Sequence, residues 1–371
     1  MMLIFLSFLV STLKENDHLI THDLVNRINN DSQSTFTAKL NRRFMNMTIG
    51  DSRRFLSPVM KIPLQHGSSR PIGANISEYS NFSHVITGYT NEQLKLNEYK
   101  FTVYNNQNFC SSWATAVTSA MSLSLSIHSK KLINLSIQYI IDCDIFGDSC
   151  MQRPALNSYE PFYRRFIPQT DQWDQNENVL RSPPKNLTDD ICKDNNGCFP
   201  NLKNCQRNQV LSGECNATDF YLNCPVYLLN NWKWMQSHLW EVGPITSSIF
   251  VKQSLFTYDG GIYSSESKFD DKIIGMMDVT IIGWGKAYQI KSEREEKWWY
   301  VIPHLGTDFG ETAGSIFNDD ERKALGLENP NQKTGIMRFN MSYDDSGIES
   351  QSIGAVPYNF IPKTLRMSNK T

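Results

Sequence analysis

Eight cysteines carry the most obvious chemistry of this sequence, and all of them lie between residues 110 and 224. None of them forms the close C-x-x-C pair that is typical of a zinc site, so we expect no metal. An even number of cysteines without such pairs favours disulfides formed in an oxidising compartment. The disulfide candidates are Cys110, Cys143, Cys150, Cys192, Cys198, Cys205, Cys215 and Cys224.

Two further features point to the secretory pathway. Residues 1–13 form an apolar run that ends at a polar segment, which is typical of a signal peptide, although a buried N-terminal strand would give the same pattern. N-x-S/T sequons mark candidate glycosylation sites. We therefore expect a protein that is secreted or sent to a lysosome-like or vacuole-like compartment. The sequons start at Asn30, Asn46, Asn75, Asn81, Asn134, Asn186, Asn216, Asn340 and Asn369.

The composition excludes several other classes of protein. The chain has 371 residues with a net charge of −2, 40% hydrophobic and 20% charged residues, as expected of a globular protein with a substantial core. Without basic runs it offers no electrostatic footprint for nucleic acid. We find no apolar stretch long enough to span a membrane. Without glycine-rich phosphate loops or metal-binding histidine pairs, no cofactor is expected.

The periodicity of apolar residues predicts helices first and strands later. Leu24, Val25 and Ile28 have helical spacing and predict a short amphipathic helix within residues 18–56. Residues 61–100 are typical of a linker, and residues 150–230 of a loop-rich region held by disulfides. Two more helices are expected near Ser111–Ser129 and Ser136–Cys143, and strands near Ile245–Val251, Val279–Gly285, Lys297–Ile302 and Gly335–Met341. This order predicts an α+β fold with a helical half and a β half.

Several motifs in the same order resemble the papain-like cysteine peptidases. The run NNQNFCSSWATAV, followed by LINLSIQYIIDC, is similar to the active-site helix of that family and the helix after it. Later runs resemble the cathepsin B branch: VGPITSSIFV, FTYDGGIY, GMMDVTIIGWG, WWYVIPHLGTDFG and SGIESQSIGAVPY. The resemblance implies a two-lobed fold, with a helical lobe at about 100–230, an antiparallel, β-barrel-like lobe at about 245–360, and a cleft between them. It also implies a propeptide at 14–60 before a peptidase domain at 61–371, with an insertion at roughly 312–333.

The resemblance also implies that the catalytic positions have changed. The residue before the family's tryptophan is the nucleophilic cysteine, and here it is Ser112. The family's histidine position holds Met277, whose thioether neither accepts nor donates a proton in catalysis. The asparagine that orients the histidine is replaced by Pro303, which offers no side-chain hydrogen bond. The family includes inactive members with serine at the cysteine position.

The substrate cleft implied by the resemblance has changed as well. Gln107 takes the position of the oxyanion donor, and Gln351 replaces the glutamate of the second subsite of cathepsin B. No histidine lies between Cys150 and Cys224, so the paired histidines of the occluding loop are absent. Cys110 takes the place of the family's structural cysteine, whose partner would be Cys150.

These positions predict a monomeric, non-catalytic member of the family that binds a protein partner or a peptide in its cleft. A working hydrolase is the alternative, with Ser112 or Cys110 as nucleophile and a non-standard base. The candidate bases are His128, His238 and His304, and we expect His304 to face away because consecutive strand residues point to opposite faces. A third reading is an inhibitor whose residues 18–56 are never removed.

Overall fold

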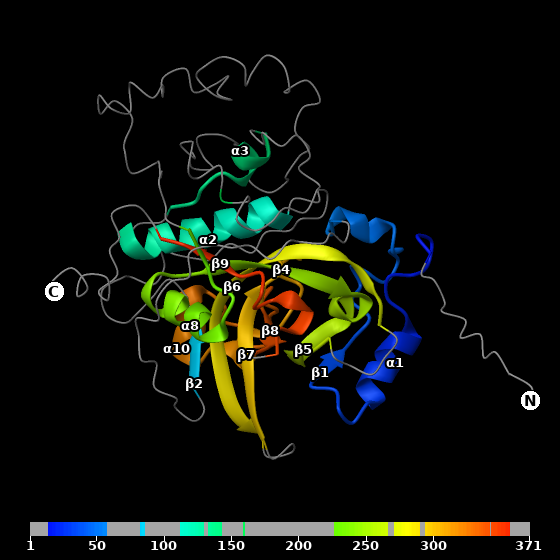
Figure 1. Cartoon of the computed structure of the whole chain (residues 1–371). Coiled ribbons are helices and arrows are strands. Elements are labelled where there is room, and N and C mark those ends of the chain that lie inside the picture. Colours follow the sequence, from blue (N-terminus) through cyan, green and yellow to red (C-terminus); the bar gives the residue numbers. More distant parts are fainter. Residues whose placement is uncertain are drawn as a thin grey trace, which may run out of the picture.

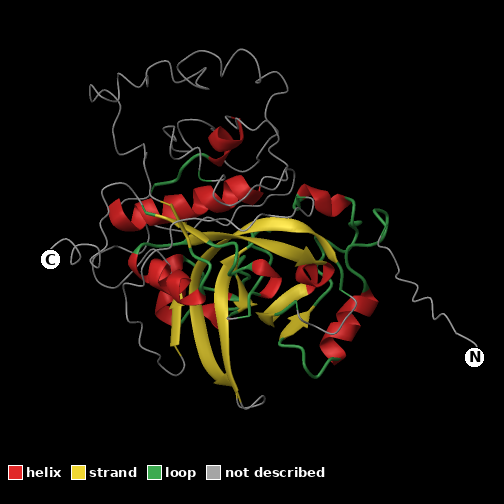
Figure 2. Cartoon of the chain, viewed as in Figure 1, coloured by secondary structure: helices red, strands yellow, loops and turns green. Residues whose placement is uncertain are grey.

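The computed structural model in Figure 1 and Figure 2 describes residues 14–57, 82–85, 112–129, 133–142, 159, 226–265, 271–289, 294–341 and 343–356. Several predicted features lie outside these ranges: the signal peptide, Gln107, all the cysteines, and the sequons at Asn75, Asn81, Asn186, Asn216 and Asn369.

The predicted helices are present. The amphipathic helix of the N-terminal segment is α1, and the two helices expected after residue 110 are α2 and α3. The α-helices are α1 (His22–Asn30), α2 (Ser112–Ser129), α3 (Ile137–Asp142), α8 (Trp232–Glu241), α9 (Ala313–Ile316) and α10 (Asp319–Leu325). Short 3-10 helices are η1 (Asp51–Arg54), η3 (Gln253–Thr257) and η4 (Asp345–Gly347).

All predicted strands fall in one large sheet whose order is β1-β5-β8-β7-β6-β4-β9-β3, with β2 also paired to β6. The pairs are antiparallel except β5 with β8. The strands are β1 (Phe36–Ala38), β2 (Phe82–Val85), β3 (Val226–Leu228), β4 (Ile245–Lys252), β5 (Tyr258–Tyr263), β6 (Ile273–Gln289), β7 (Arg294–Ile302), β8 (Met337–Asn340) and β9 (Ile353–Ala355). The sheet of the described residues ends at β1 and β3 and is not closed, so the expectation of a β-barrel-like lobe is corrected to an open sheet.

Strand β6 is the centre of this sheet. Its first half pairs with β4 and its second half with β2, while β7 runs along its other side. The register shifts between Ile281 and Gly283, where a bulge increases the local twist. Residues 274–285 of β6 are buried, which is typical of a strand covered on both faces.

Helix α2 covers one face of β6 and β4 (Figure 1). The side chains of its residues 112–127 are small or apolar on every side, and Trp113, Ala116 and Val117 are fully buried. Such a helix belongs in a protein interior rather than at a surface. Thr280 of β6 donates a hydrogen bond of 3.1 Å to the carbonyl of Ala116, which ties the helix to the strand.

The N-terminal segment, residues 14–57, packs against the opposite side of the β half. Leu24 and Ile28 of α1 are buried, as their spacing predicts. Strand β1 extends the sheet by pairing with β5 (Figure 2). The phenyl ring of Phe36 stacks on Tyr258 with the centroids 6.1 Å apart.

The predicted insertion at 312–333 folds as α9 and α10. Asn318 and Glu321 form a reciprocal capping box at the start of α10, and Gly326 ends the helix with a left-handed φ of 66°. Phe317 and Leu325 from this insertion pack in a hydrophobic cluster on the sheet. The insertion therefore adds a small covering layer.

Two neighbouring glycines of β5 give a matched test of the β1–β5 contact. Gly261 has a φ of +95°, and a Cβ atom there would lie 2.6 Å from the carbonyl oxygen of Thr35. At Gly260 an added Cβ would meet nothing closer than a carboxylate oxygen of Glu311 at 3.4 Å. We expect Gly261→Ala to lower the free energy of unfolding by roughly 2 kcal/mol or more, measured by denaturant titration. Gly260→Ala is the control, and equal losses in both variants would contradict this account of the contact.

Candidate active-site region

Ser112 is the first residue of α2 and lies against β6. Its side chain is 1% exposed. The backbone N–H of Asp278 donates a hydrogen bond of 3.1 Å to its hydroxyl oxygen. Among the described side chains, which do not include that of His128, no imidazole is hydrogen-bonded to this hydroxyl. A serine nucleophile needs an adjacent base to take its proton, so this arrangement leaves Ser112 without the usual activation.

Met277 is a core residue in this structure. Residues 278 and 280 share one face of β6, and the side chain of Thr280 reaches α2 on that face. Met277, Val279 and Ile281 alternate with them and belong to the main hydrophobic cluster. Met277 is 1% exposed. Its side chain thus contributes apolar packing at the position that the resemblance assigns to the family's histidine.

Pro303 and His304 follow the end of β7. Pro303 is buried, and His304 has a left-handed backbone with a φ of 55°. The expectation that His304 faces away because strand residues alternate was based on a wrong premise, since β7 ends at Ile302. The imidazole Nε2 instead lies 3.0 Å from the hydroxyl of Thr280, beside α2. Because that hydroxyl donates to Ala116, it accepts the N–H of the imidazole.

His304 is a poor proton acceptor in this environment. Its ring is completely buried, and burial lowers its pKa from 6.5 to about 3. An effective general base has a pKa close to the working pH. Thr280, its partner, contacts Ala116, one helical turn beyond Ser112. The ring therefore supports the packing of α2 on β6.

Asp278, the neighbour of Met277, is the other acidic or basic group that could replace the missing base. Strand alternation predicts that it points away from the side of Met277, and its backbone N–H indeed lies on the side of α2, bonded to Ser112. Asp278 is 3% exposed and forms a short hydrogen bond with the hydroxyl of Ser248, its cross-strand neighbour.

The remaining predicted positions in the described residues show no catalytic arrangement. Gln351 is half-buried, and its backbone N–H donates to the carbonyl of Gly347. His238 is fully buried in α8, where its ring lies against Gly354. Among the described residues, no group of three or more His, Cys, Asp or Glu side chains is arranged to hold a metal ion.

The candidate glycosylation sites differ in exposure. Asn30 and Asn46 are exposed, whereas Asn134 and Asn340 are half-buried. In the described parts of the chain, no helix is both long enough and apolar enough to cross a membrane.

The class of protein follows from a match to the family model "Papain family cysteine protease", which covers residues 90–331. The chain belongs to this family. Its fold is papain-like, with mixed α and β content. A procathepsin B from Trypanosoma congolense superposes with a TM-score of 0.62 at 15% identity, covering 92% of this chain and 100% of that one. The recombinant stem bromelain precursor gives a TM-score of 0.57 at 15% identity, covering 91% and 88%.

Curated relatives show a narrower similarity. A tubulointerstitial nephritis antigen-like protein of Rattus norvegicus is 25% identical over 218 residues, which are 55% of this chain and 45% of the relative. The Mus musculus protein of the same name is 26% identical over 216 residues. The matched region is thus less than half the length of these relatives.

The buried His304 predicts a pH dependence of stability. In the unfolded chain its pKa is about 6.5, whereas the folded pKa is lowered to about 3, so protonation favours unfolding. The stability that the neutral imidazole provides is complete above pH 6.5 and falls as the pH drops toward 3. At pH 4.5 the loss is on the order of 2 kcal/mol.

His304→Gln tests this dependence. We expect the variant to lose less stability than the wild type between pH 7 and pH 4.5, measured by urea unfolding at each pH. His22→Gln, at an exposed site in α1, is the matched control and keeps the wild-type slope. If His304→Gln shows the wild-type slope too, the burial argument is wrong.

Proposed function

We propose that this protein is a non-catalytic member of the papain family that works by binding a protein partner or a peptide. The observation that carries this proposal is the environment of Ser112, a buried hydroxyl that accepts a hydrogen bond from the Asp278 amide and has no imidazole beside it among the described residues. In proteases that use such a catalytic unit, loss of its members lowers kcat by about a millionfold.

The other two positions support the same conclusion. Met277 packs in the hydrophobic core, and the side chain of Pro303 has no donor or acceptor to orient an imidazole. His304, the candidate base next to Pro303 in the sequence, is hydrogen-bonded to Thr280 and has a pKa lowered to about 3 by burial. The family membership provides the papain-like fold on which this proposal rests.

Substitutions at Ser112 and Cys110 test the proposal. We expect no hydrolysis of fluorogenic dipeptide substrates above the buffer rate from pH 4 to pH 8. Ser112→Cys supplies a better nucleophile, and we expect it to stay inactive because no described imidazole lies beside it to activate the thiol. Active papain measured in parallel controls for the assay.

Two results would contradict the proposal. Turnover by the wild type that disappears in Ser112→Ala or Cys110→Ala would identify a working nucleophile. A gain of activity in Ser112→Cys would reveal a functional base near that position.

We further propose that the protein enters the secretory pathway, because its cysteines, its sequons and residues 1–13 all favour that route. Expressed in a secreting eukaryotic host, the protein should lack residues 1–13 and carry glycan on the exposed Asn30 and Asn46. Alkylation without reduction should add no mass, since disulfides leave no free thiols. Intact mass before and after glycosidase treatment checks these points, and a cytosolic product with reactive thiols would refute them.

A further inference from the structure

We propose that residues 14–57 are a permanent structural part of the domain, and that they stay bound if the chain is cut between residues 58 and 81. This goes beyond the proposed function, since a retained segment is compatible with either catalytic status.

Backbone hydrogen bonds attach the segment to the sheet at two separate places. At β5, the amide of Ile262 donates to Thr35 and the amide of Lys39 donates to Thr257, at 2.9 and 2.7 Å. At β6, Ser57 and Met276 exchange two hydrogen bonds of 2.9 Å. The second contact uses the backbone N–H and the carbonyl of Met276, the residue before Met277. The segment therefore occupies the edge of β6 next to the altered active-site positions.

The segment also shares one hydrophobic core with the β half. Phe44 is fully buried, and its ring lies 5.0 Å from that of Phe256 and 6.3 Å from that of Phe309. Phe55 packs edge-on against Phe44 at 5.8 Å. Leu19 and Ile28 belong to the same cluster. Release of the segment would expose to water both these side chains and the apolar surface of the β half that they cover, which is unfavourable.

Arg43 attaches the segment to the loop that contains Pro303 and His304. Its side chain is 7% exposed, and its guanidinium donates a short hydrogen bond to the carbonyl of Leu305. The guanidinium lies over the rings of Phe44 and Phe55, at 5.3 and 5.4 Å from their centroids. A buried cation is tolerated where hydrogen bonds and ring faces replace water, and this site provides both.

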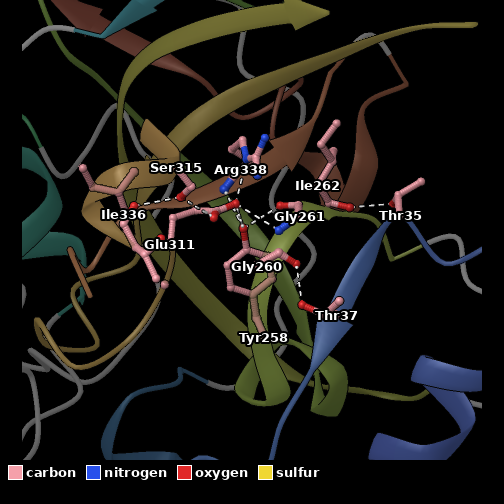
Figure 3. A network of polar contacts seen from close by, with 12 residues as sticks. Thr35, Thr37, Tyr258, Gly260, Gly261, Ile262, Glu311, Ser315, Ile336 and Arg338 are labelled. Atoms are coloured by element: carbon pink, nitrogen blue, oxygen red, sulfur yellow. Dashed lines mark hydrogen bonds and ion pairs between the residues drawn. The ribbon is translucent and has the colours of Figure 1, made fainter. Parts of the chain in front are cut away.

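A buried ion pair holds the docking edge of β5 in shape (Figure 3). Glu311 is 3% exposed, pairs with Arg338 at 2.6 Å, and accepts the amide of Gly261 at 2.9 Å and the hydroxyl of Tyr258 at 2.9 Å. From the N-terminal segment, the hydroxyl of Thr35 donates a hydrogen bond of 2.6 Å to the carbonyl of Ile262, the next residue of β5. The edge that receives β1 is thus preorganised by the β half itself.

Acid should not release the segment, because few titratable groups connect it to the rest. Lys39 pairs with Asp259 at 3.9 Å and Arg43 with Asp308 at 3.6 Å, and the second carboxylate is 64% exposed. Ion pairs in which one partner is this exposed to water contribute little to stability. Glu311 faces β5 but is paired with Arg338 of the β half.

Two further sets of charged groups lie in this environment, beside His304, which is bonded to Thr280 of β6 and whose protonation in acid weakens the whole fold. Asp271 accepts the amide of Ser254 in η3, the helix that carries Phe256. Burial raises the pKa of Asp271, so its protonation in acid removes a charge that is costly to bury. On the segment itself, Arg27 pairs with Asp23, Arg53 with Glu15 and Arg54 with Asp51, all within residues 14–57.

A single cut in the full-length protein tests the proposal. A site-specific protease sequence replaces residues 66–72, and the cut protein is run on size exclusion at pH 7.5 and pH 4.5 with mass analysis of each peak. We expect the N-terminal fragment to co-elute with the remainder at both pH values. Separation from a folded remainder at either pH would overturn the proposal.

Two adjacent arginines provide the matched variants. Arg43 is buried and Arg42 is exposed. In the cut protein we expect Arg43→Met to raise the dissociation rate of the fragment at least tenfold, and Arg42→Met to change it less than twofold. Equal dissociation rates in the two variants would contradict the role of Arg43 in holding the segment.

Hydrogen exchange of the protein that carries the protease site and no other change tests the proposal even if Arg43→Met does not fold. The amide of Ile262, which donates to Thr35, should exchange equally slowly before and after the cut. Loss of its protection on cutting would overturn the proposal even if the fragment co-elutes. Hydrolysis assays on the same samples keep this result separate from the question of catalysis.

Discussion

The alternation of side chains along β6 is the constraint on which the rest of this structure depends. Thr280 and Asp278 face α2, while Met277, Val279 and Ile281 face the main core. This alternation brings the start of α2 against the backbone of Asp278, where the hydroxyl of Ser112 accepts a hydrogen bond. The chemistry available at Ser112 is therefore decided by a strand that is far from it in sequence.

The altered active-site positions and the N-terminal segment belong to the same packing arrangement. Arg43 bonds to Leu305, two residues after Pro303, and Ser57 pairs with Met276, one residue before Met277. Apolar and backbone contacts of this kind hold a segment in place without a titratable switch. The region thus combines a buried hydroxyl at Ser112 with a continuous core, an arrangement that fits the proposed binding role.

Polar groups buried in this protein mostly serve its architecture. Glu311 and Arg338 neutralise each other beneath β5, and Asp278 is bonded to Ser248 between two central strands. His304 is bonded to Thr280 and kept neutral by burial, which lowers its pKa to about 3. Because each has a partner, these groups orient neighbouring elements at a smaller cost than isolated buried charges.

The sequence by itself determined the features that depend on local order and residue type. The apolar spacing of residues 112–129 predicts α2, and the ordered motifs predict that Ser112, Met277 and Pro303 are altered catalytic positions. Only the tertiary structure decided the features that depend on long-range contacts. The open sheet, the left-handed turn that brings His304 to Thr280, and the bond from Arg43 to Leu305, 262 residues away, leave no periodic signal. Periodicity reports which face of an element is buried, whereas the partner of that face is chosen by the packing of the whole chain.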